Sequence, residues 1–410
     1  MSAPGGVHDE RVDPVDPVER RLACAIRAAA SDRRALHLCG GGSKAGLGGT
    51  THGEALSTLG LQGIVDYDPA ELVVTVRAGT PLLELQTELA EHGQMLPFEP
   101  PAWPGATVGG AVASGLAGPR RAFAGSVRDA LLGVRLLDGQ GQALRFGGRV
   151  MKNVAGFDLF RLQAGAWGRL GLLLEVSFRL LPRPQREVTV ALACGVDEAI
   201  TRMNQLAGAP MPLSAAAWSQ GTLRLRLSGS AAGVSAALPG IGGDALDADA
   251  AACFWAGAAA MPPDGSAMSP VALAAGAAEA PLTPTASAAV PALWRLAVPA
   301  TTRSLGAEGE VAIDWCGGLR WLRTDAPADE VRVLAATLGG HATAWRGNPA
   351  RPAMHPLDPV RLALHRRLFE VFDPHGVFDS GRFDGDAPAG AASAAAAEAS
   401  MARSSSASRH

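Results

Sequence analysis

Apolar and polar residues in the first 180 positions follow two different periods, which predict both helices and strands. Helical spacing covers residues 17–30 and 81–92. The second helix is expected to have Thr80 as its N-cap and Pro81 at its first position. Short runs rich in branched apolar residues predict strands at 35–39, 64–67, 72–77, 132–137, 143–146 and 172–181.

The hydrophobic pattern changes after Pro182-Arg183-Pro184, which we interpret as a domain boundary. Beyond it, the same two periods predict strands at 188–193, 223–227, 294–298 and 311–315 and helices at 197–206, 331–338 and 360–372. Residues 240–292 are rich in Ala, Gly and Pro with little periodicity, and we expect a loop or insertion there. The pattern therefore predicts two domains between disordered ends, with boundaries at 1–17, 18–183, 184–385 and 386–410.

One stretch of small residues, WPGATVGGAVASGLAG at 103–118, has the composition of a binding site. Thr107 is a suitable helix N-cap, and Gly109 and Gly110 follow it. Glycine costs about 1 kcal/mol relative to alanine inside a helix. Two glycines at a helix start therefore favour close contact with a ligand, and the free N–H groups there suit an anion such as a diphosphate. A tight helix–helix crossing explains the glycines equally well.

A second glycine-rich loop, GGGSK at Gly40–Lys44, follows the predicted strand at 35–39. Its consecutive glycines let backbone N–H groups converge on an anion, with Ser43 adding a hydroxyl. A flexible loop is the alternative interpretation. The spacing fits neither a Walker loop nor a GxGxxG turn. The match of GIGGDA at Gly240–Ala245 to a dinucleotide-binding pattern has no strand before it, so we treat it as accidental.

Composition and charge narrow the class of protein. The chain has 410 residues, a formal net charge of −3 and a pI near 6.3, which gives no electrostatic case for binding nucleic acid. No apolar run approaches the ~20 residues of a membrane span, and no secretion signal begins the chain, so we expect a soluble cytoplasmic protein. The five cysteines lie at least 15 residues apart, which predicts reduced thiols, no iron–sulfur cluster and no metal site.

Together, the motifs resemble the vanillyl-alcohol-oxidase (PCMH) type of FAD-binding domain. The triple-glycine loop, LVVTVRAGTPL, PGATVGG, SVRDALLGVRLLDGQG and AGAWGRLGLLLEVSFRLLP occur in that family's order over residues 35–182. More narrowly, GGGSKAGLG, LPFEPPAWPGATVGGAVASGLAGPRR and RFGGRVMKNVAGFDLFRL are similar to the FAD-binding E subunits of bacterial glycolate oxidases. IDWCGGLRWLRT and FDPHGVFDSGRF extend the similarity into the second domain. The resemblance implies an α+β protein, with an FAD-binding domain of two α/β subdomains followed by an α+β cap or substrate domain.

The resemblance also implies which residues hold FAD. Family members with covalent flavin often carry a histidine near the first glycine loop, whereas Ser43 and Lys44 follow the glycines here. We therefore expect noncovalent FAD, with His52 only a loop residue and Phe98 and Trp103 as aromatic walls. The implied contacts come from two phosphate loops, nearby segments and the strand at the flavin edge, namely Gly40, Gly41, Gly42, Ser43, Lys44, Pro104, Gly105, Ala106, Thr107, Val108, Gly109, Gly110, Ala111, Ser114, Gly118, Asp129, Gly165, Gly171 and Leu172.

Oxidation of a 2-hydroxy acid needs a cation for the carboxylate and a base for the hydroxyl proton. The candidates are first Arg320 and Arg382 as cations, then His341, His365 and His375 as bases, and finally Lys152 as a contact to flavin or carboxylate. Each is also explained by a structural or surface role, and Lys152 by an interior ion pair. Only Lys44 and Lys152 among the 36 basic residues are lysine, which suggests specific roles for both.

The resemblance implies an FAD-dependent oxidoreductase acting on CH–OH groups, as one subunit of a complex that oxidises glycolate to glyoxylate. The scattered cysteines provide no one-electron relay, so an iron–sulfur subunit would be needed. A second flavoprotein subunit is also implied, and the substrate site lies either there or in this chain. Any membrane association would be peripheral, through these partners. The alternatives are a self-sufficient FAD oxidase or dehydrogenase of another hydroxy compound, and a non-catalytic FAD-binding scaffold.

Overall fold

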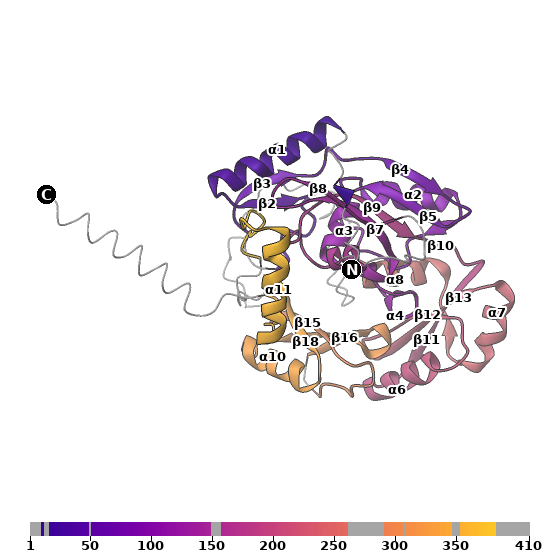
Figure 1. The fold of residues 1–410 in the computed structure, drawn as a ribbon. Coiled ribbons are helices and arrows are strands. Elements are labelled where there is room, and N and C mark those ends of the chain that lie inside the picture. Colours follow the sequence, from indigo (N-terminus) through magenta and orange to yellow (C-terminus); the bar gives the residue numbers. More distant parts are fainter. Residues whose placement is uncertain are drawn as a thin grey trace, which may run out of the picture.

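The structure is a computed structural model that describes residues 10–11, 16–48, 51–148, 157–260, 291–306, 309–346 and 353–382. Two domains follow one another along the chain (Figure 1). The first, coloured indigo to magenta, lies above the second, coloured rose to orange, in that view.

A six-stranded sheet forms the centre of the first domain. Its strands are β1 (Glu10–Arg11), β4 (Ile64–Asp68), β5 (Val73–Arg77), β7 (Leu131–Leu137), β8 (Ala143–Gly147) and β9 (Leu172–Arg179). Their order is β1-β8-β7-β9-β5-β4, and every neighbouring pair is antiparallel. Two small sheets join it, the parallel pair β2 (Leu36–Cys39) and β3 (Glu54–Ser57) and the antiparallel pair β6 (Gln94–Met95) and β10 (Leu181–Pro182).

Most helices of this domain cover the two faces of the sheet and create two cores. The helices are α1 (Pro17–Asp32), α2 (Leu82–Glu91), α3 (Val108–Ser114), α4 (Arg121–Ala124), α5 (Val127–Ala130) and the 3₁₀ turn η1 (Leu159–Gln163). The short α4 packs instead on β12 (Leu213–Ser219) of the second domain. Strand β9 shows why two layers are needed, because its side chains are buried on both faces. Leu173 packs with the residues of α2 and α3, whereas Leu172 packs with those of α1 and β2.

The second domain is an eight-stranded antiparallel sheet with helices on one face. In spatial order its strands are β14 (Asp244–Ala245), β11 (Arg186–Ala193), β13 (Thr222–Gly229), β12 (Leu213–Ser219), β16 (Glu310–Asp314), β17 (Leu319–Thr324), β15 (Ala292–Ala297) and β18 (His341–Arg346). Helices α6 (Val196–Ala207), α7 (Ala231–Ala237) and α10 (Ala328–Thr337) pack on the face away from the first domain. On the opposite face, Leu293, Trp321 and Trp345 form a cluster with Leu47 and Leu116 of the first domain.

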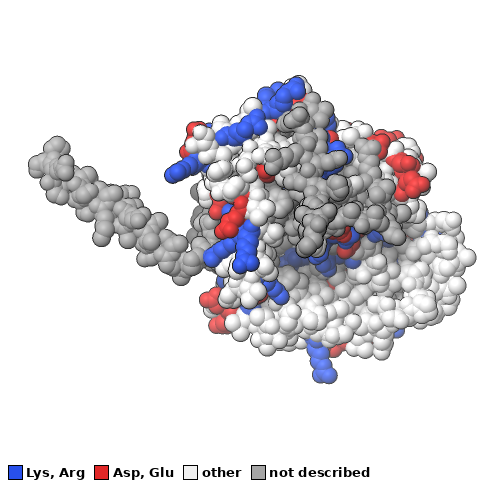
Figure 2. Space-filling view, viewed as in Figure 1, with Lys and Arg blue, Asp and Glu red and all other residues white. Residues whose placement is uncertain are grey.

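The remaining elements lie between or beside the domains. They are α8 (Ala248–Ala260), α11 (Pro359–Phe372) and the short 3₁₀ turns η2 (Leu238–Gly240) and η3 (Trp315–Gly317). Figure 2 shows a hollow between the two halves of the molecule, with basic and acidic side chains inside it. Other charged side chains on this face gather over α1 and α11.

The helices and strands expected from periodicity are confirmed, with ends within three residues of the expected ones. The exceptions have local causes. Helix α2 begins at Leu82 after Pro81, and the hydroxyl of Thr80 accepts a hydrogen bond from the Gly63 N–H at 3.0 Å instead of capping the helix. Strand β12 was not expected because LSAAAWS has few branched residues. Helix α8 was expected to be a loop because its alanines have no periodic polar face.

Two described segments near the ends of the chain differ from the expected domain boundaries. Strand β1, within the segment expected to be disordered, pairs with β8. The residues after α11, which we placed in the second domain, pack on the first. There the Leu36 N–H donates to the Val377 carbonyl at 2.7 Å, and Val377 and Phe378 join the core under α1.

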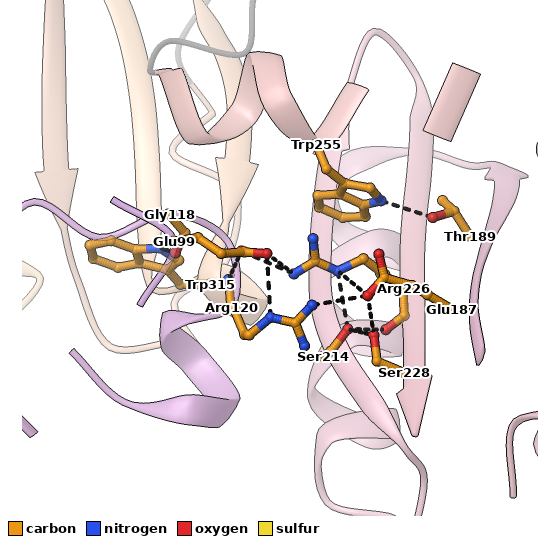
Figure 3. A network of polar contacts seen from close by, with 10 residues as sticks. All are labelled: Glu99, Gly118, Arg120, Glu187, Thr189, Ser214, Arg226, Ser228, Trp255 and Trp315. Carbon is orange, nitrogen blue, oxygen red and sulfur yellow. Dashed lines mark hydrogen bonds and ion pairs between the residues drawn. The ribbon is translucent and has the colours of Figure 1, made fainter. Parts of the chain in front are cut away.

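A network of charged side chains joins the two domains (Figure 3). Glu99 of the first domain accepts hydrogen bonds from Arg120 at 3.3 Å and, across the interface, from Arg226 at 3.0 Å. Arg120 in turn donates to Glu187 of the second domain at 2.9 Å. Burial alone would raise the pKa of Glu99, but Arg226 and Arg120 lower it below the usual range. The network therefore holds four alternating charges at the joint between the domains.

Candidate functional site

A cavity in the first domain brings together the two glycine-rich stretches. It is lined by the end of β2, the loop after it, one side of α3 and the start of β9. Of the contacts that the resemblance implied, it contains Gly40, Gly41, Gly42, Ser43, Lys44, Thr107, Gly109, Gly110, Ser114, Gly171 and Leu172. We call this the first cavity. The two runs of small residues, more than 60 positions apart in the sequence, thus form one wall of one site.

Three glycines are needed where the two loops come into close contact. A Cβ on Gly41 would lie 2.0 Å from the Gly105 carbonyl oxygen, and a Cβ on Gly40 would lie 2.4 Å from Thr107 Oγ1. Gly105 itself has φ of +73°, a conformation that favours glycine. The glycines at 40, 41 and 105 therefore permit the loops to meet, whereas Gly42 has open space around the position of a Cβ.

The N–H groups that an anion can use come from the first loop, not from the start of α3. The N–H of Val108 donates to the Thr80 carbonyl at 3.0 Å, and that of Gly109 to the Ala78 carbonyl at 2.7 Å. The N–H of Gly110 donates to Thr107 Oγ1 at 3.2 Å. The expectation of free N–H groups at this helix start was therefore wrong. In the loop 41–44, by contrast, no backbone N–H has a hydrogen-bond partner within the described parts of the chain.

Lys44 supplies a buried positive charge at the first cavity. Its side chain is buried, and its Nζ lies 3.3 Å from Ser43 Oγ and 5.5 Å from the centre of the Trp103 ring. No acidic side chain pairs with it among the residues that the structure describes, and burial lowers the pKa of Lys44 to about 8. A buried ammonium with free backbone N–H groups beside it fits a diphosphate. The donors of this cavity therefore match the phosphates of FAD.

The other implied contacts lie outside the first cavity. Gly118 belongs to the joint between the domains, where its carbonyl accepts a hydrogen bond from Trp315 Nε1 at 3.0 Å and a Cβ would lie 2.6 Å from the Glu99 carbonyl oxygen (Figure 3). Asp129 accepts from Ser126 in a capping box of α5. Gly165 lines a separate cavity, and the remaining positions that do not line the first cavity are Pro104, Gly105, Ala106, Val108 and Ala111.

The structure shows how Gly171 and the two aromatic candidates lie relative to the first cavity. Gly171 lines the first cavity, but its missing Cβ faces β7, where it would lie 2.8 Å from the Leu137 carbonyl oxygen. Gly171 thus serves the packing of β9 on β7. Phe98 is fully buried in the core of the first domain and is not a wall of the cavity. Trp103 lies near Lys44 and donates its Nε1–H to the Ala260 carbonyl at 2.8 Å.

A second cavity lies between the domains and adjoins the first. Its volume is about 580 Å³, and Ser114 and Trp167 line both cavities. On the side of the first domain it is lined by Gly165 and Leu116, and on the side of the second by residues of β15, β18 and the segment up to α11. We call this the second cavity. A ligand held in the first cavity can therefore present one end to the space between the domains.

Trp167 is a residue of the site that sequence reasoning missed. It has φ of +52°, which is unusual for a large side chain and indicates local strain. Its N–H donates to the Ala113 carbonyl at 2.8 Å, and Arg382 stacks over its ring at 4.7 Å. The available signal was its place between two glycines in AGAWG, which we interpreted through the glycines alone.

The structure places the candidate catalytic residues in different surroundings. Arg320 is completely buried, and its guanidinium donates to the Gly317 carbonyl at 2.8 Å and to Glu310 at 3.0 Å, so its role is structural. His375 is exposed and lines neither cavity. Arg382 lines the first cavity. Lys152 lies outside the described residues.

Two of the proposed bases, His341 and His365, line the second cavity. Burial lowers the pKa of His341, and the nearby cations, Arg295 first, lower it further. The imidazole of His341 is therefore neutral at neutral pH and able to accept a proton. Sequence reasoning missed His355 and Arg295, which line the same cavity.

The fold and the first cavity define the class of protein, an FAD-binding flavoprotein. A family model described as an FAD binding domain matches residues 19–147. FAD is the cofactor that this family and the donors of the first cavity indicate. In solved structures, alkyldihydroxyacetonephosphate synthase superposes with a TM-score of 0.59 at 12% identity, covering 88% of this chain and 75% of that one. That likeness shows a shared fold.

The particular family follows from a relative of nearly full length. The chain is 38% identical to glycolate oxidase subunit GlcE of Escherichia coli (strain K12) over 358 residues, which cover 87% of this chain and 95% of that protein. It is also 30% identical to glycolate oxidase subunit GlcD of Bacillus subtilis (strain 168) over 174 residues, 42% of this chain and 36% of that one. The chain belongs to the GlcE family of glycolate oxidase subunits, and it is an oxidoreductase of the flavoprotein class.

Two further findings concern metals and membranes. Within the described ranges, no three His, Cys, Asp or Glu side chains are grouped as metal ligands would be. In the same ranges, no helix has the length and hydrophobicity that a membrane crossing requires. The five cysteines, all in described segments, are free thiols.

Proposed function

We propose that this chain is the FAD-bearing subunit of a complex that oxidises glycolate, or a closely similar 2-hydroxy acid, to the 2-oxo acid. The observation that carries the proposal is the junction of the two cavities. The first has the donors for a diphosphate, and the second, reached past Trp167 and Ser114, lies between the domains and has a neutral histidine in its wall. Likeness to GlcE over 87% of the chain supports glycolate as the substrate.

The residues present define what the chain itself contributes. Lys44 and the N–H groups of the loop 41–44 would hold the diphosphate of noncovalently bound FAD. When bound, FAD supplies the acceptor for the hydride that leaves the carbon bearing the hydroxyl. His341 takes the hydroxyl proton, so the substrate loses one hydride and one proton and becomes the 2-oxo acid. Trp167 lines both cavities and would lie beside the end of FAD that faces the substrate.

The two electrons must then leave this chain. Its cysteines are scattered and supply no iron–sulfur ligands in the described segments, so we propose an iron–sulfur partner as the one-electron acceptor. A second flavoprotein subunit of the GlcD type is the other proposed partner, because GlcD of Bacillus subtilis is itself named a glycolate oxidase subunit and is 30% identical to this chain over 174 residues. In this proposal, any contact with a membrane is peripheral and comes through those partners.

Anaerobic reduction tests the proposed function. The purified chain, loaded with FAD, is mixed with glycolate in the absence of oxygen while the flavin absorbance is recorded. We expect the oxidised bands to bleach with glycolate, in the chain alone or once the partner subunits are added, and glyoxylate to appear in equal amount. Protein that takes up no FAD, or bound flavin that stays oxidised under both conditions, contradicts the proposal. Reduction by an unrelated alcohol with rapid peroxide release would instead indicate a self-sufficient oxidase.

A further inference from the structure

Arg295 is a cation inside the second cavity whose charge has no acidic partner. It lies on β15, opposite Thr343 of β18 and Trp321 of β17. Thr343 lines the same cavity. The Nε of Arg295 is buried and has no hydrogen-bond partner, and no carboxylate forms an ion pair with the guanidinium among the residues described. A charged group left in this state is costly unless something else binds it.

Aromatic rings and a second cation surround the guanidinium. It lies 4.9 Å from the centre of the Trp315 ring and 5.9 Å from that of Trp345. Arg121 stacks over the same Trp315 ring at 4.1 Å. Burial and the charge of Arg121 lower the pKa of Arg295 to about 10, and the guanidinium still carries its charge at neutral pH. The rings hold the guanidinium in place without neutralising it.

The neighbouring strand shows what a structural arginine looks like in this sheet. Arg320 on β17 lies next to β15, where it pairs with Leu296. Each side of its guanidinium has a partner, in Gly317, Glu310 and Thr302. The guanidinium of Arg295 has no such hydrogen-bond or ion-pair partner among the described residues. Asp314 is the carboxyl whose charge acts on the pKa of Arg295. It accepts a hydrogen bond from the Trp315 N–H at 2.6 Å, and burial raises its own pKa to about 7. Asp314 is therefore only partly ionised at neutral pH and is a weak counter-charge.

We propose that Arg295 binds the carboxylate of the hydroxy-acid substrate in the second cavity, an inference that rests on the proposed function. A guanidinium presents parallel N–H donors that match the two oxygens of a carboxylate. A cavity of about 580 Å³ is within the usual size range of small-molecule sites. The consequence is that the substrate site belongs to this chain and not to its flavoprotein partner.

Binding of non-oxidisable carboxylates tests the assignment independently of turnover. Oxalate and acetate are titrated into the oxidised FAD-loaded chain, and the heat of binding and the shift of the flavin bands are recorded. We expect Arg295→Met to weaken oxalate binding by about 10- to 100-fold, the usual effect of losing a charge-assisted hydrogen bond. Arg303→Met, at an exposed arginine of the same domain, is the matched control and should bind like the wild type.

The outcomes that overturn the assignment are distinct from failure of the proposed function. Unchanged oxalate affinity in Arg295→Met overturns it, as does inorganic phosphate competing with oxalate at equal affinity, which would indicate a general anion site. If Arg295→Met does not fold, Arg295→Lys decides, because it keeps the charge and loses the paired donors. It should retain FAD and bind oxalate about tenfold more weakly. If the variants oxidise glycolate and bind oxalate as the wild type does, the proposed function is supported and the assignment of Arg295 is wrong.

Discussion

Buried or half-buried cations without acidic partners distinguish the binding residues of this protein from its structural ones. Arg320 and Arg135 are buried and paired with Glu310 and with Glu19, respectively. Lys44 and Arg295 line cavities and form no ion pair with described residues. Because an uncompensated buried charge destabilises a protein, these two positions indicate where anionic ligands bind.

Lys44 makes FAD affinity depend on pH. Its pKa of about 8 means that the side chain loses its proton above that pH in the FAD-free protein. A diphosphate favours the charged form, so binding above pH 8 takes up a proton and the dissociation constant should rise by up to about tenfold per pH unit. Quenching of flavin fluorescence at pH 7, 8 and 9 measures this. Lys44→Arg, which stays charged, should abolish the slope, and a slope that survives this substitution contradicts the role.

Asp314 should make the folded protein less stable as pH rises. Its folded pKa, about 7, is above the ordinary value of 3.8, so the folded state holds its proton more strongly. The stabilisation is complete below about pH 4 and is lost as pH rises through 7, a loss of about 3 kcal/mol between pH 5 and 8. Asp314→Asn keeps an acceptor for the Trp315 N–H and should remove this decline in urea unfolding. Parallel curves for the two proteins would show that Asp314 is not the group responsible.

At the scale of elements, the first cavity depends on two loops in backbone contact. In Gly41→Ala the new methyl group would lie 2.0 Å from the Gly105 carbonyl oxygen, which is closer than two atoms can approach. The two loops must therefore separate. We expect FAD to bind at least tenfold more weakly, since a displacement that costs about 1.4 kcal/mol is enough. Gly46→Ala, in the same loop with open space around it, is the control. Equal FAD content and affinity in the two variants would show that the loop contact does not shape the site.

The elements also show which helices and strands could be predicted from hydrophobic periodicity. Strand β5 (VVTVR) was predictable because its run of β-branched residues is buried on both faces, and α2 because its leucines recur on one buried face. Strand β12 and helix α8 were not, because alanine suits either structure and leaves no polar face to set a period. Their identity depends on packing. Trp255 of α8 donates its Nε1–H to Thr189 Oγ1 of β11 at 2.8 Å, and this hydrogen bond holds the helix against the sheet of the second domain.

At the scale of the whole molecule, the charged joint links the two domains. Glu99→Gln leaves Arg226 and Arg120 without their shared counter-charge, and should lower the free energy of unfolding by about 3 kcal/mol. Urea denaturation measures the change. Glu84→Gln, at an exposed glutamate of α2, serves as control and should differ from wild type by less than about 0.5 kcal/mol. A loss in Glu99→Gln no larger than in the control would mean that the joint adds nothing to stability.

The sequence by itself determined the two glycine-rich loops, most helices and strands, and the resemblance that the GlcE likeness later confirmed. These are local properties, because a glycine run, a cap or a hydrophobic period acts over a few residues. Only the tertiary structure decided that the start of α3 has no free N–H groups, that Gly118 belongs to the joint, and that Arg320 is structural while Arg295 faces a cavity. Two arginines on adjacent strands of one sheet read alike in sequence. Their roles differ because the partners of each are set by chain segments that only folding brings beside them.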